Sequence, residues 1–244
     1  MLRMMGGTPE PPGAEKGHAH HGMHGTSEHL AKPSRTGAVP GPPSRSSLRQ
    51  ERATEDSMSK VIVVEFVSLD GVTQDPDGSD GSPQGGWAFR YGPEAVAGDK
   101  FRLGEVMDTG AMLLGRRTWQ LFAKLWPGRD DPFSAKMNAM TKLVVSRSLD
   151  HVDEWQNSVV LRGELTAEVR ERKQAQDVVV VGSASVAHTL MAENMVDEYR
   201  LLVFPVILGE GTRMFPEGTP PAGLDLVSAE TAGPAVRLTY RRAR

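Results

Sequence analysis

Three short stretches of the sequence combine glycine, hydroxyl groups and arginine in a way that suits an anionic ligand. They are Gly115-Arg-Arg-Thr118, Ser146-Arg-Ser148 and Gly182-Ser-Ala-Ser185, and each follows a run of apolar residues. The first and third also lead into stretches with helical character, whose first N–H groups and dipole favour an anion. Arginine adds bidentate phosphate binding. A single turn of this kind is more often structural, because glycine is frequent at strand ends for steric reasons, but three in one sheet favour a phosphate-bearing ligand.

A ligand with a polyphosphate and one additional phosphate fits these turns, so NADPH is the cofactor that we expect. The usual nucleotide motifs are absent, because the sequence has no G-x-G-x-x-G after a strand and no G-x-x-x-x-G-K-[ST]. A G-x-S-x-G nucleophile elbow is also absent. Cysteine does not occur, which excludes disulfides, thiolate metal sites and cysteine nucleophiles. We expect no metal centre.

Strand-like and helix-like stretches alternate from Met58 onward and must position these turns. The expected strands are 61–69, 111–114, 142–146, 158–161, 177–181 and 199–208, and the expected helices are 94–107, 118–125, 134–140, 166–174 and about 183–194. Two further strands, 224–230 and 236–241, should form an antiparallel hairpin around Gly233-Pro234. The pattern predicts a three-layer α/β fold, a mostly parallel twisted sheet with flanking helices and a C-terminal antiparallel hairpin. Ligands of such sheets bind outside the carboxyl ends of the strands.

The segment between the first expected strand and the first expected helix, residues 74–93, is unusually long and rich in Gly, Pro and Asp. Loops of this length in compact domains are usually functional or mobile. The loop also contains the aromatic residues Trp87 and Phe89. His188 lies in an expected helix beside apolar neighbours, and a packed or surface position is favoured over catalysis.

The first 57 residues differ in composition from the rest. They contain no Phe, Trp, Tyr or Ile and are rich in Gly, Pro, Ser and His, which predicts a disordered low-complexity tail. The His18–His21 tract could hold a divalent metal loosely, but a polar tail is favoured because nothing rigid fixes the ligand geometry. Strand-like sequence begins soon after Met58, so Met58 is a candidate true start. Residues 58–244 are expected to form one domain.

The overall charge and hydropathy exclude other classes of function. The formal net charge is -3, which gives no reason to expect binding to nucleic acid or to anionic membranes. The longest apolar runs are far shorter than the roughly 20 residues that span a bilayer. No cationic start is followed by an apolar stretch at the N-terminus. We therefore expect a cytoplasmic protein.

Five motifs in order resemble the dihydrofolate reductase-like family, in particular its branch related to the C-terminal reductase domain of the bifunctional riboflavin-biosynthesis deaminase/reductase. The motifs are SLDG (68–71), LLGRRTW (113–119), LVVSRSL (143–149), VVVVGSASV (178–186) and VDEYRLLVFPVILGEGTRMF (196–215). The resemblance covers about residues 60–242. It implies a mostly parallel sheet that binds NADPH at the carboxyl ends of its strands. The zinc ligands of the deaminase domain are absent, which argues against a complete bifunctional enzyme.

The resemblance assigns cofactor-binding roles to the three turns. It implies that Gly115, Arg116, Arg117 and Thr118 contact the phosphates on the adenosine side of the cofactor. It also implies that Ser146 and Arg147 contact the adenosine 2′-phosphate. The glycine-rich turn over the pyrophosphate corresponds to Gly182, Ser183, Ala184, Ser185 and Val186. True dihydrofolate reductases have consecutive glycines where this chain has Gly-Ser-Ala, whereas the related branch commonly has Gly-Ser. Which arginine meets the 2′-phosphate stays open.

The catalytic and substrate-binding residues follow from the same resemblance. Counting back from Gly115 places Asp99 where dihydrofolate reductases carry a catalytic carboxylate, although a solvated charge on a helix face is an equal alternative. Asp70 is the second candidate carboxylate. The resemblance also implies that the long loop, residues 74–93, with Trp87 and Phe89, covers the substrate. The candidate substrate-binding residues are Leu69, Gly71, Trp87, Gly209, Gly211 and Thr212.

The sequence thus predicts an NADPH-dependent reductase that transfers a hydride to a small heterocyclic substrate, pteridine- or pyrimidine-like. Such a reaction requires the protein to position the nicotinamide against the acceptor and to exclude water. The resemblance also implies a homodimer. Two alternatives stay open. One is a dedicated dihydrofolate or 5-amino-6-ribosylaminouracil-phosphate reductase, with 5-amino-6-(5-phosphoribosylamino)uracil reductase activity in the second case. The other is a catalytically silent NADP(H)-binding dimeric sensor.

Overall fold

The computed structural model describes residues 58–92, 94–96 and 103–243. The expected tail, residues 1–57, and the candidate catalytic residue Asp99 lie outside the described residues. Within them, eight strands form one sheet in the order β4-β3-β2-β5-β1-β6-β8-β7. The strands are β1 (Val61–Ser68), β2 (Ala111–Gly115), β3 (Thr141–Val145), β4 (Ser158–Leu161), β5 (Val178–Val181), β6 (Glu198–Phe204), β7 (Leu224–Ala232) and β8 (Ala235–Arg242).

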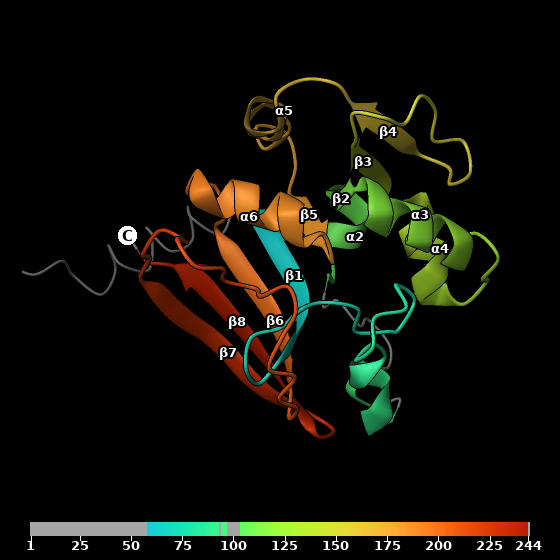
Figure 1. The fold of residues 1–244 in the computed structure, drawn as a ribbon. Coiled ribbons are helices and arrows are strands. Elements are labelled where there is room, and N and C mark those ends of the chain that lie inside the picture. Colours follow the sequence, from blue (N-terminus) through green and yellow to red (C-terminus); the bar gives the residue numbers. More distant parts are fainter. Residues whose placement is uncertain (1–57, 93, 97–102, 244) are drawn as a thin grey trace, which may run out of the picture. The chain divides into compact units, whose positions relative to one another are not determined.

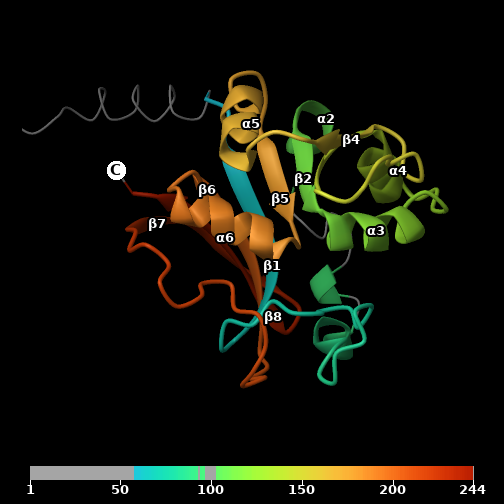
Figure 2. The same ribbon diagram turned by 45° about the horizontal axis from the view of Figure 1, so that its top comes forward.

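Helices cover both faces of this sheet (Figure 1, Figure 2). The α-helices are α2 (Val106–Thr109), α3 (Arg116–Leu125), α4 (Pro132–Ala139), α5 (Leu165–Arg172) and α6 (Ala184–Ala192), and two 3₁₀ helices are η1 (Trp87–Tyr91) and η2 (Glu94–Val96). Side chains of a strand alternate between the two faces. In β1, Val61 and Val63 therefore pack in an apolar cluster with α5 and α6. Ile62 and Val64 pack in a second cluster with α2, α3 and α4. The predicted three-layer arrangement is confirmed.

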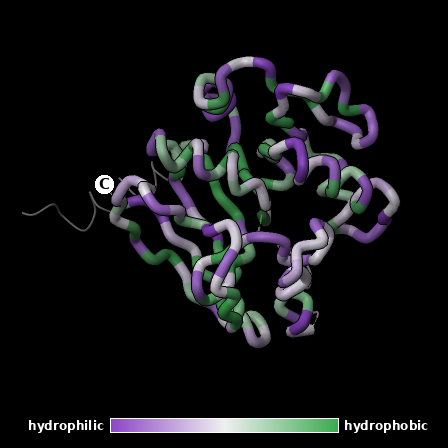
Figure 3. Tube along the Cα trace, viewed as in Figure 1, coloured by the Kyte–Doolittle hydropathy of each residue, from purple (hydrophilic) through white to green (hydrophobic). Residues whose placement is uncertain are grey.

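The centre of the sheet is parallel and its C-terminal end is antiparallel. β1 pairs in parallel with β5 and β6, and β2 pairs in parallel with β3 and β5. β8 pairs antiparallel with both β6 and β7, so the predicted C-terminal hairpin is confirmed. Hydrophobic segments gather where the central strands run, and hydrophilic segments occupy the surrounding loops (Figure 3). In the described part of the chain, no helix has the length and apolar character that a membrane crossing requires.

Two of the expected elements differ from the observed ones. The expected single helix over 94–107 is wrong, because η2 ends at Val96 and α2 begins only at Val106. The turn before α2 contains Gly104 with a φ of +55°, a left-handed conformation that ends regular helix. The strand expected to reach residue 208 ends at Phe204. Pro205 follows it and has no N–H to donate to a ladder.

The long loop is anchored to the sheet by a third apolar cluster. The Trp87 side chain is fully buried there, and its ring meets the ring of Phe204 edge-on with 5.5 Å between the centroids. The indole Nε1 of Trp87 donates to the backbone oxygen of Gln74 at 2.8 Å. This packing fixes the C-terminal part of the loop and leaves Phe89, two residues later, half-exposed.

Candidate functional site

A cavity of about 820 Å³ lies at the carboxyl ends of β1, β2, β3 and β5. This volume falls within the roughly 300–1,000 Å³ of typical small-molecule sites. Residues of all three polar turns line the cavity, among them Gly115–Thr118, Ser146–Ser148 and Gly182–Val186. The structure therefore brings every predicted cofactor-binding residue to one site. Their role in binding a cofactor stays a prediction.

The cavity extends past the end of β5, along the part of β1 that is no longer in register with it. β5 ends at Val181, which is in register with Val64, whereas β1 continues to Ser68. The cavity is lined there by Val64, Glu65 and Phe66 of β1 and by Val181 of β5. In open α/β sheets, ligands bind in the crevice outside the carboxyl ends of the strands.

The turns after β2 and β5 are tied to each other by two hydrogen bonds. The backbone N–H of Gly115 donates to the Ser183 hydroxyl at 2.9 Å. The Thr118 hydroxyl donates to the backbone oxygen of Gly182 at 3.0 Å. Gly182 has a φ of +61°, which a residue with a side chain rarely adopts, so glycine is required at this turn. These bonds hold the N-termini of α3 and α6 beside each other.

The two helix N-termini are suited to a phosphate. Gly115 and Ser183 are the N-cap residues, and in the described structure neither makes a side-chain capping hydrogen bond to its own helix. The Ser183 hydroxyl accepts from Gly115 instead of from its own helix. The first-turn N–H groups of both helices thus lack a side-chain acceptor, which is the arrangement that attracts an anion.

The turn after β3 adds the positive charge of Arg147 to the two helix N-termini. The buried Ser146 hydroxyl accepts hydrogen bonds from the backbone N–H groups of Ser148 at 3.2 Å and Leu149 at 3.0 Å. It therefore organises the turn itself. The exposed Arg147 lies between these residues and lines the cavity.

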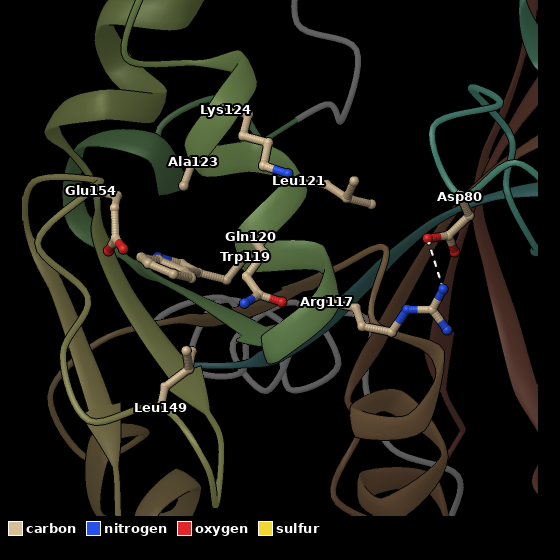
Figure 4. A pocket seen from close by; sticks show the side chains of 9 residues that line it. All are labelled: Asp80, Arg117, Trp119, Gln120, Leu121, Ala123, Lys124, Leu149 and Glu154. Carbon is tan, nitrogen blue, oxygen red and sulfur yellow. Dashed lines mark hydrogen bonds and ion pairs between the residues drawn. The ribbon is translucent and has the colours of Figure 1, made fainter.

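The three arginines at the cavity are not equivalent. Arg117 donates to the Asp80 carboxylate of the long loop at 3.0 Å (Figure 4). Both side chains also line a smaller neighbouring pocket of about 370 Å³. Arg116 and Arg147 form no ion pair with any residue that the structure describes. An exposed pair such as Arg117–Asp80 adds little to stability, but it occupies one arginine and leaves the other two available to a phosphate.

The long loop forms one wall of the cavity. Residues between Thr73 and Asp80, together with Phe89, line it. Asp75 organises the loop, because its buried carboxylate accepts from the backbone N–H groups of Asp80 at 2.9 Å and Ser82 at 2.8 Å. Burial would raise the pKa of Asp75, but these hydrogen bonds outweigh it and lower the pKa. These hydrogen bonds join the beginning of the loop, at Asp75, to residues 80 and 82.

The predicted substrate residues are only partly at the cavity. Thr212 lines it, whereas Leu69, Gly71, Gly209 and Gly211 are not among its lining residues. Trp87 is also placed elsewhere: its side chain is in the third apolar cluster, and Phe89 takes the position at the cavity. The expectation that the Trp87 ring faces a ligand is corrected by its complete burial.

Asp70, the second candidate catalytic carboxylate, joins the loop after β1 to the loop after β6 through hydrogen bonds. It accepts hydrogen bonds from the Ser68 hydroxyl at 2.7 Å and from the N–H groups of Leu208 at 3.1 Å and Gly209 at 2.8 Å. The hydrogen bond from Ser68 and those from the two backbone groups lower the pKa of Asp70 to about 2. An acid with so low a pKa is a poor proton donor at neutral pH, and Asp70 does not line the cavity. The structure gives Asp70 a structural position.

Among the carboxyl groups that line the cavity, Glu65 is the one that comes from a central strand, and the sequence motifs did not indicate it. It is only 4% exposed, and its Oε1 is buried without a hydrogen-bond partner in the described structure. Burial raises the pKa of Glu65 from 4.5 to about 8. The signal in the sequence was a single carboxylate within VIVVEFVS, a strand whose every residue is buried.

The residues described here contain no cluster of three or more His, Asp or Glu side chains that could hold a metal ion. His188 lines the cavity from α6, and its Nε2 lies 2.9 Å from the backbone oxygen of Arg213. The groups that line the site include two helix N-termini, three arginines, and the buried carboxyl groups of Glu65 and Asp75.

Comparison with protein families matches residues 59–238 to the RibD C-terminal domain. The chain belongs to this family. It is a family of oxidoreductases, and the match confirms the resemblance to the dihydrofolate reductase-like branch that the motifs indicated.

Individual relatives share modest identity with the chain. The uncharacterized protein YwjB of Bacillus subtilis (strain 168) is 28% identical over 193 residues, which are 75% of this chain and 98% of YwjB. The uncharacterized protein YyaP of the same organism is 28% identical over 137 residues, 53% of this chain and 72% of YyaP.

Solved structures share the fold. A putative riboflavin biosynthesis protein from Shewanella sp. PV-4 superposes with a TM-score of 0.61 at 19% identity, covering 76% of this chain and 99% of that one. A pyrimidine reductase-like protein from Corynebacterium diphtheriae superposes with a TM-score of 0.51 at 11% identity, covering 86% of this chain and 97% of that one.

Proposed function

We propose that the protein is an NADPH-dependent reductase that transfers a hydride to a small pteridine- or pyrimidine-like heterocycle. The observation that carries the proposal is the meeting of three turns in one cavity, with two helix N-termini and two arginines that have no carboxylate partner among the described residues. Membership of the RibD C-terminal domain family supports a reductase. The name of the Corynebacterium relative, a pyrimidine reductase-like protein, supports a heterocycle of this type.

The residues of the site fit NADPH in charge and position. The N-termini of α3 and α6, held together by Gly115 and Ser183, would hold the pyrophosphate. Arg116 and Arg147 would bind the adenosine 2′-phosphate through charge-assisted hydrogen bonds. When bound, the reduced nicotinamide supplies the hydride. The protein would orient the acceptor and exclude water with the loop wall that Asp75 and Phe89 help to form.

Binding and turnover are tested separately. Isothermal titration calorimetry with NADPH and NADH measures cofactor choice, and the loss of the reduced-nicotinamide absorbance band against a panel of pteridines and pyrimidines measures turnover. We expect tighter binding of NADPH than of NADH, and oxidation with at least one acceptor. Absence of binding to either nucleotide would overturn the proposal, whereas binding without turnover on any acceptor would favour the sensor.

We also propose that the protein is a homodimer. β7 is one of the two edge strands of the described sheet and exposes Leu224, Leu226 and Val227. An exposed apolar edge strand favours pairing with another chain. Size-exclusion chromatography with light scattering tests this directly, since a monomer mass at micromolar concentration would contradict it.

A further inference from the structure

We propose that the carboxyl group of Glu65 binds the ligand of this cavity, by hydrogen bonding an amide-type edge in which an N–H donor lies beside a C=O acceptor. The proposal deepens the proposed function and rests on it where the ligand is NADPH. Two sources share this chemistry, namely the carboxamide of a nicotinamide and the cyclic amide of a pteridine or pyrimidine acceptor.

Glu65 lies on β1 at the place where the neighbouring strand β5 ends. Its neighbour Val64 is in register with Val181, the last residue of β5, so Glu65 lies just beyond the end of that strand. On its other side Glu65 is in register with Leu201 of β6. By strand alternation it shares the face of Val63 and Val67, which pack in one cluster with Val186 of α6.

The distance from Glu65 to the arginines fits an elongated ligand. In the sheet, β1 is separated from β2 by β5, and β3 lies beyond β2. Because neighbouring strands are about 4.8 Å apart, β1 is roughly 10 Å from β2 and roughly 14 Å from β3. A ligand whose phosphates sit at Arg116 and Arg147 can therefore present an uncharged ring system to Glu65 at its other end.

Besides its position, Glu65 has a carboxyl oxygen without a hydrogen-bond partner within the described part of the chain. Its Oε1 is buried and has no hydrogen-bond partner in the described residues. Buried polar atoms are nearly always paired in native proteins, and an unpaired one calls for an explanation. A buried carboxyl oxygen that lacks a partner, on a side chain that lines a cavity, is explained by a ligand that supplies the missing hydrogen bond.

The protonation of Glu65 defines which ligand edge fits. Burial raises its pKa to about 8, so at neutral pH the group is neutral and carries one O–H donor and one C=O acceptor. The complement of this pair is an amide edge. The charged or titratable groups that line the cavity from other elements are Asp75, Asp77, Asp80, Arg116, Arg117, Arg147 and His188. On β6, Glu198 and Arg200 pair with each other at 2.7 Å.

The test compares ligands that carry or lack the amide. Calorimetry on the full chain uses NADP⁺, 2′-phospho-ADP-ribose, which lacks the nicotinamide, and the pteridine-dione lumazine. The variants are Glu65→Leu, which removes both hydrogen-bonding atoms, and Glu65→Gln, which keeps a donor and an acceptor. Glu198→Gln is the matched control, because Glu198 is a buried carboxylate of β6 that pairs with Arg200 and Arg241 and does not line the cavity.

Because Glu65→Leu loses the hydrogen bonds, its affinity for the amide-bearing ligand should be about 10- to 100-fold lower than that of the parent. The affinities of Glu65→Gln and Glu198→Gln should be nearly those of the parent. If Glu65→Leu loses affinity for NADP⁺ but not for 2′-phospho-ADP-ribose, the group that Glu65 binds is the nicotinamide carboxamide. If Glu65→Leu loses affinity for lumazine, the group that Glu65 binds is the cyclic amide of the acceptor. Equal affinity of parent and Glu65→Leu for all three probes overturns the proposal.

One further measurement keeps the outcomes distinct. The infrared C=O band of a protonated carboxyl group should be present in the parent at neutral pH, absent in Glu65→Gln, and shifted by the bound ligand. Absence of the band in the parent overturns the proposal even if Glu65→Leu fails to fold. If the parent binds neither NADPH nor NADH, the proposed function fails, and the measurement with lumazine still tests whether Glu65 binds a ligand. If it also fails to bind lumazine, both proposals fail.

Discussion

The backbone N–H of Gly115 donates a 2.9 Å hydrogen bond to the hydroxyl of Ser183, a residue 68 positions later in the chain. This bond joins the turn after β2 to the turn after β5 and sets the N-termini of α3 and α6 side by side. The proposed phosphate site depends on that arrangement, because neither helix alone would present both sets of N–H groups to one ligand.

The Ser183→Ala substitution should therefore weaken both the fold and the site. It leaves the Gly115 N–H without its acceptor, and we expect a loss of about 1 kcal/mol in the free energy of unfolding. NADPH affinity should fall as well. Urea unfolding and calorimetry measure the two effects. Ser185→Ala is the control for stability, because Ser185 is exposed, and an equal loss in both variants would contradict the role of the Gly115–Ser183 bond.

The arginines should contribute unequally to the preference for NADPH. Arg147→Ala and Arg116→Ala should each lower the affinity for NADPH, about tenfold or more where a charge-assisted hydrogen bond is lost, with a smaller effect on NADH. Arg117→Ala should have the least effect, because Asp80 already occupies that guanidinium. Titration of each variant with both nucleotides checks this order, and a dominant effect of Arg117→Ala would reverse our assignment.

The loop wall should be sensitive to the space beside Asp75. A Cβ added at Gly85 would lie 2.3 Å from Asp75 Oδ2 and 2.9 Å from its Cγ. Gly85→Ala should thus displace the carboxylate that organises the loop and lower the free energy of unfolding by about 1–3 kcal/mol. Gly128→Ala, where nothing lies within 4 Å of the added Cβ, is the control. Similar melting temperatures for the two variants would show that the contact at Gly85 relaxes freely.

Stability should depend on pH through Glu65. Its pKa is raised from 4.5 to about 8 by burial, so between these values the folded protein holds a proton that the unfolded chain has released. The contribution of Glu65 is therefore fully present below pH 4.5 and is lost as the pH rises toward 8, by at most about 1.4 kcal/mol per pH unit. Relative to the parent, Glu65→Gln should gain stability across this window. Unfolding curves of the parent and Glu65→Gln at pH 5 and pH 8 measure this gain. If the difference in the free energy of unfolding is the same at both pH values, Glu65 is not protonated in the folded protein as we expect.

The sequence predicted most of what positions the site. Apolar runs such as Val61–Ser68 and Val178–Val181 are long enough to mark central strands, and the carboxyl ends of parallel strands necessarily share one edge of a sheet. The meeting of Gly115, Ser146 and Gly182 therefore followed from alternation of strands and helices. The expected strand was too long at its end, because Pro205 has no N–H to donate and β6 ends at Phe204.

Other features depend on packing that local patterns do not contain. The ion pair between Asp80 and Arg117 joins residues 37 positions apart across a loop without regular periodicity. Trp87 resembled a ligand-contacting aromatic residue, yet it fills the space beside Phe204. Glu65 could have been found from its type alone, since a carboxylate in a wholly buried strand requires a partner or a ligand.

The central claim is that the cavity binds NADPH through Arg116 and Arg147, and calorimetry of the full chain with NADPH and NADH tests it most directly. We predict tighter binding of NADPH in the parent and loss of that preference in the Arg116→Ala/Arg147→Ala double variant, with NADH affinity nearly unchanged. Equal affinity of the parent for the two nucleotides, or a preference that survives the double substitution, would contradict the account.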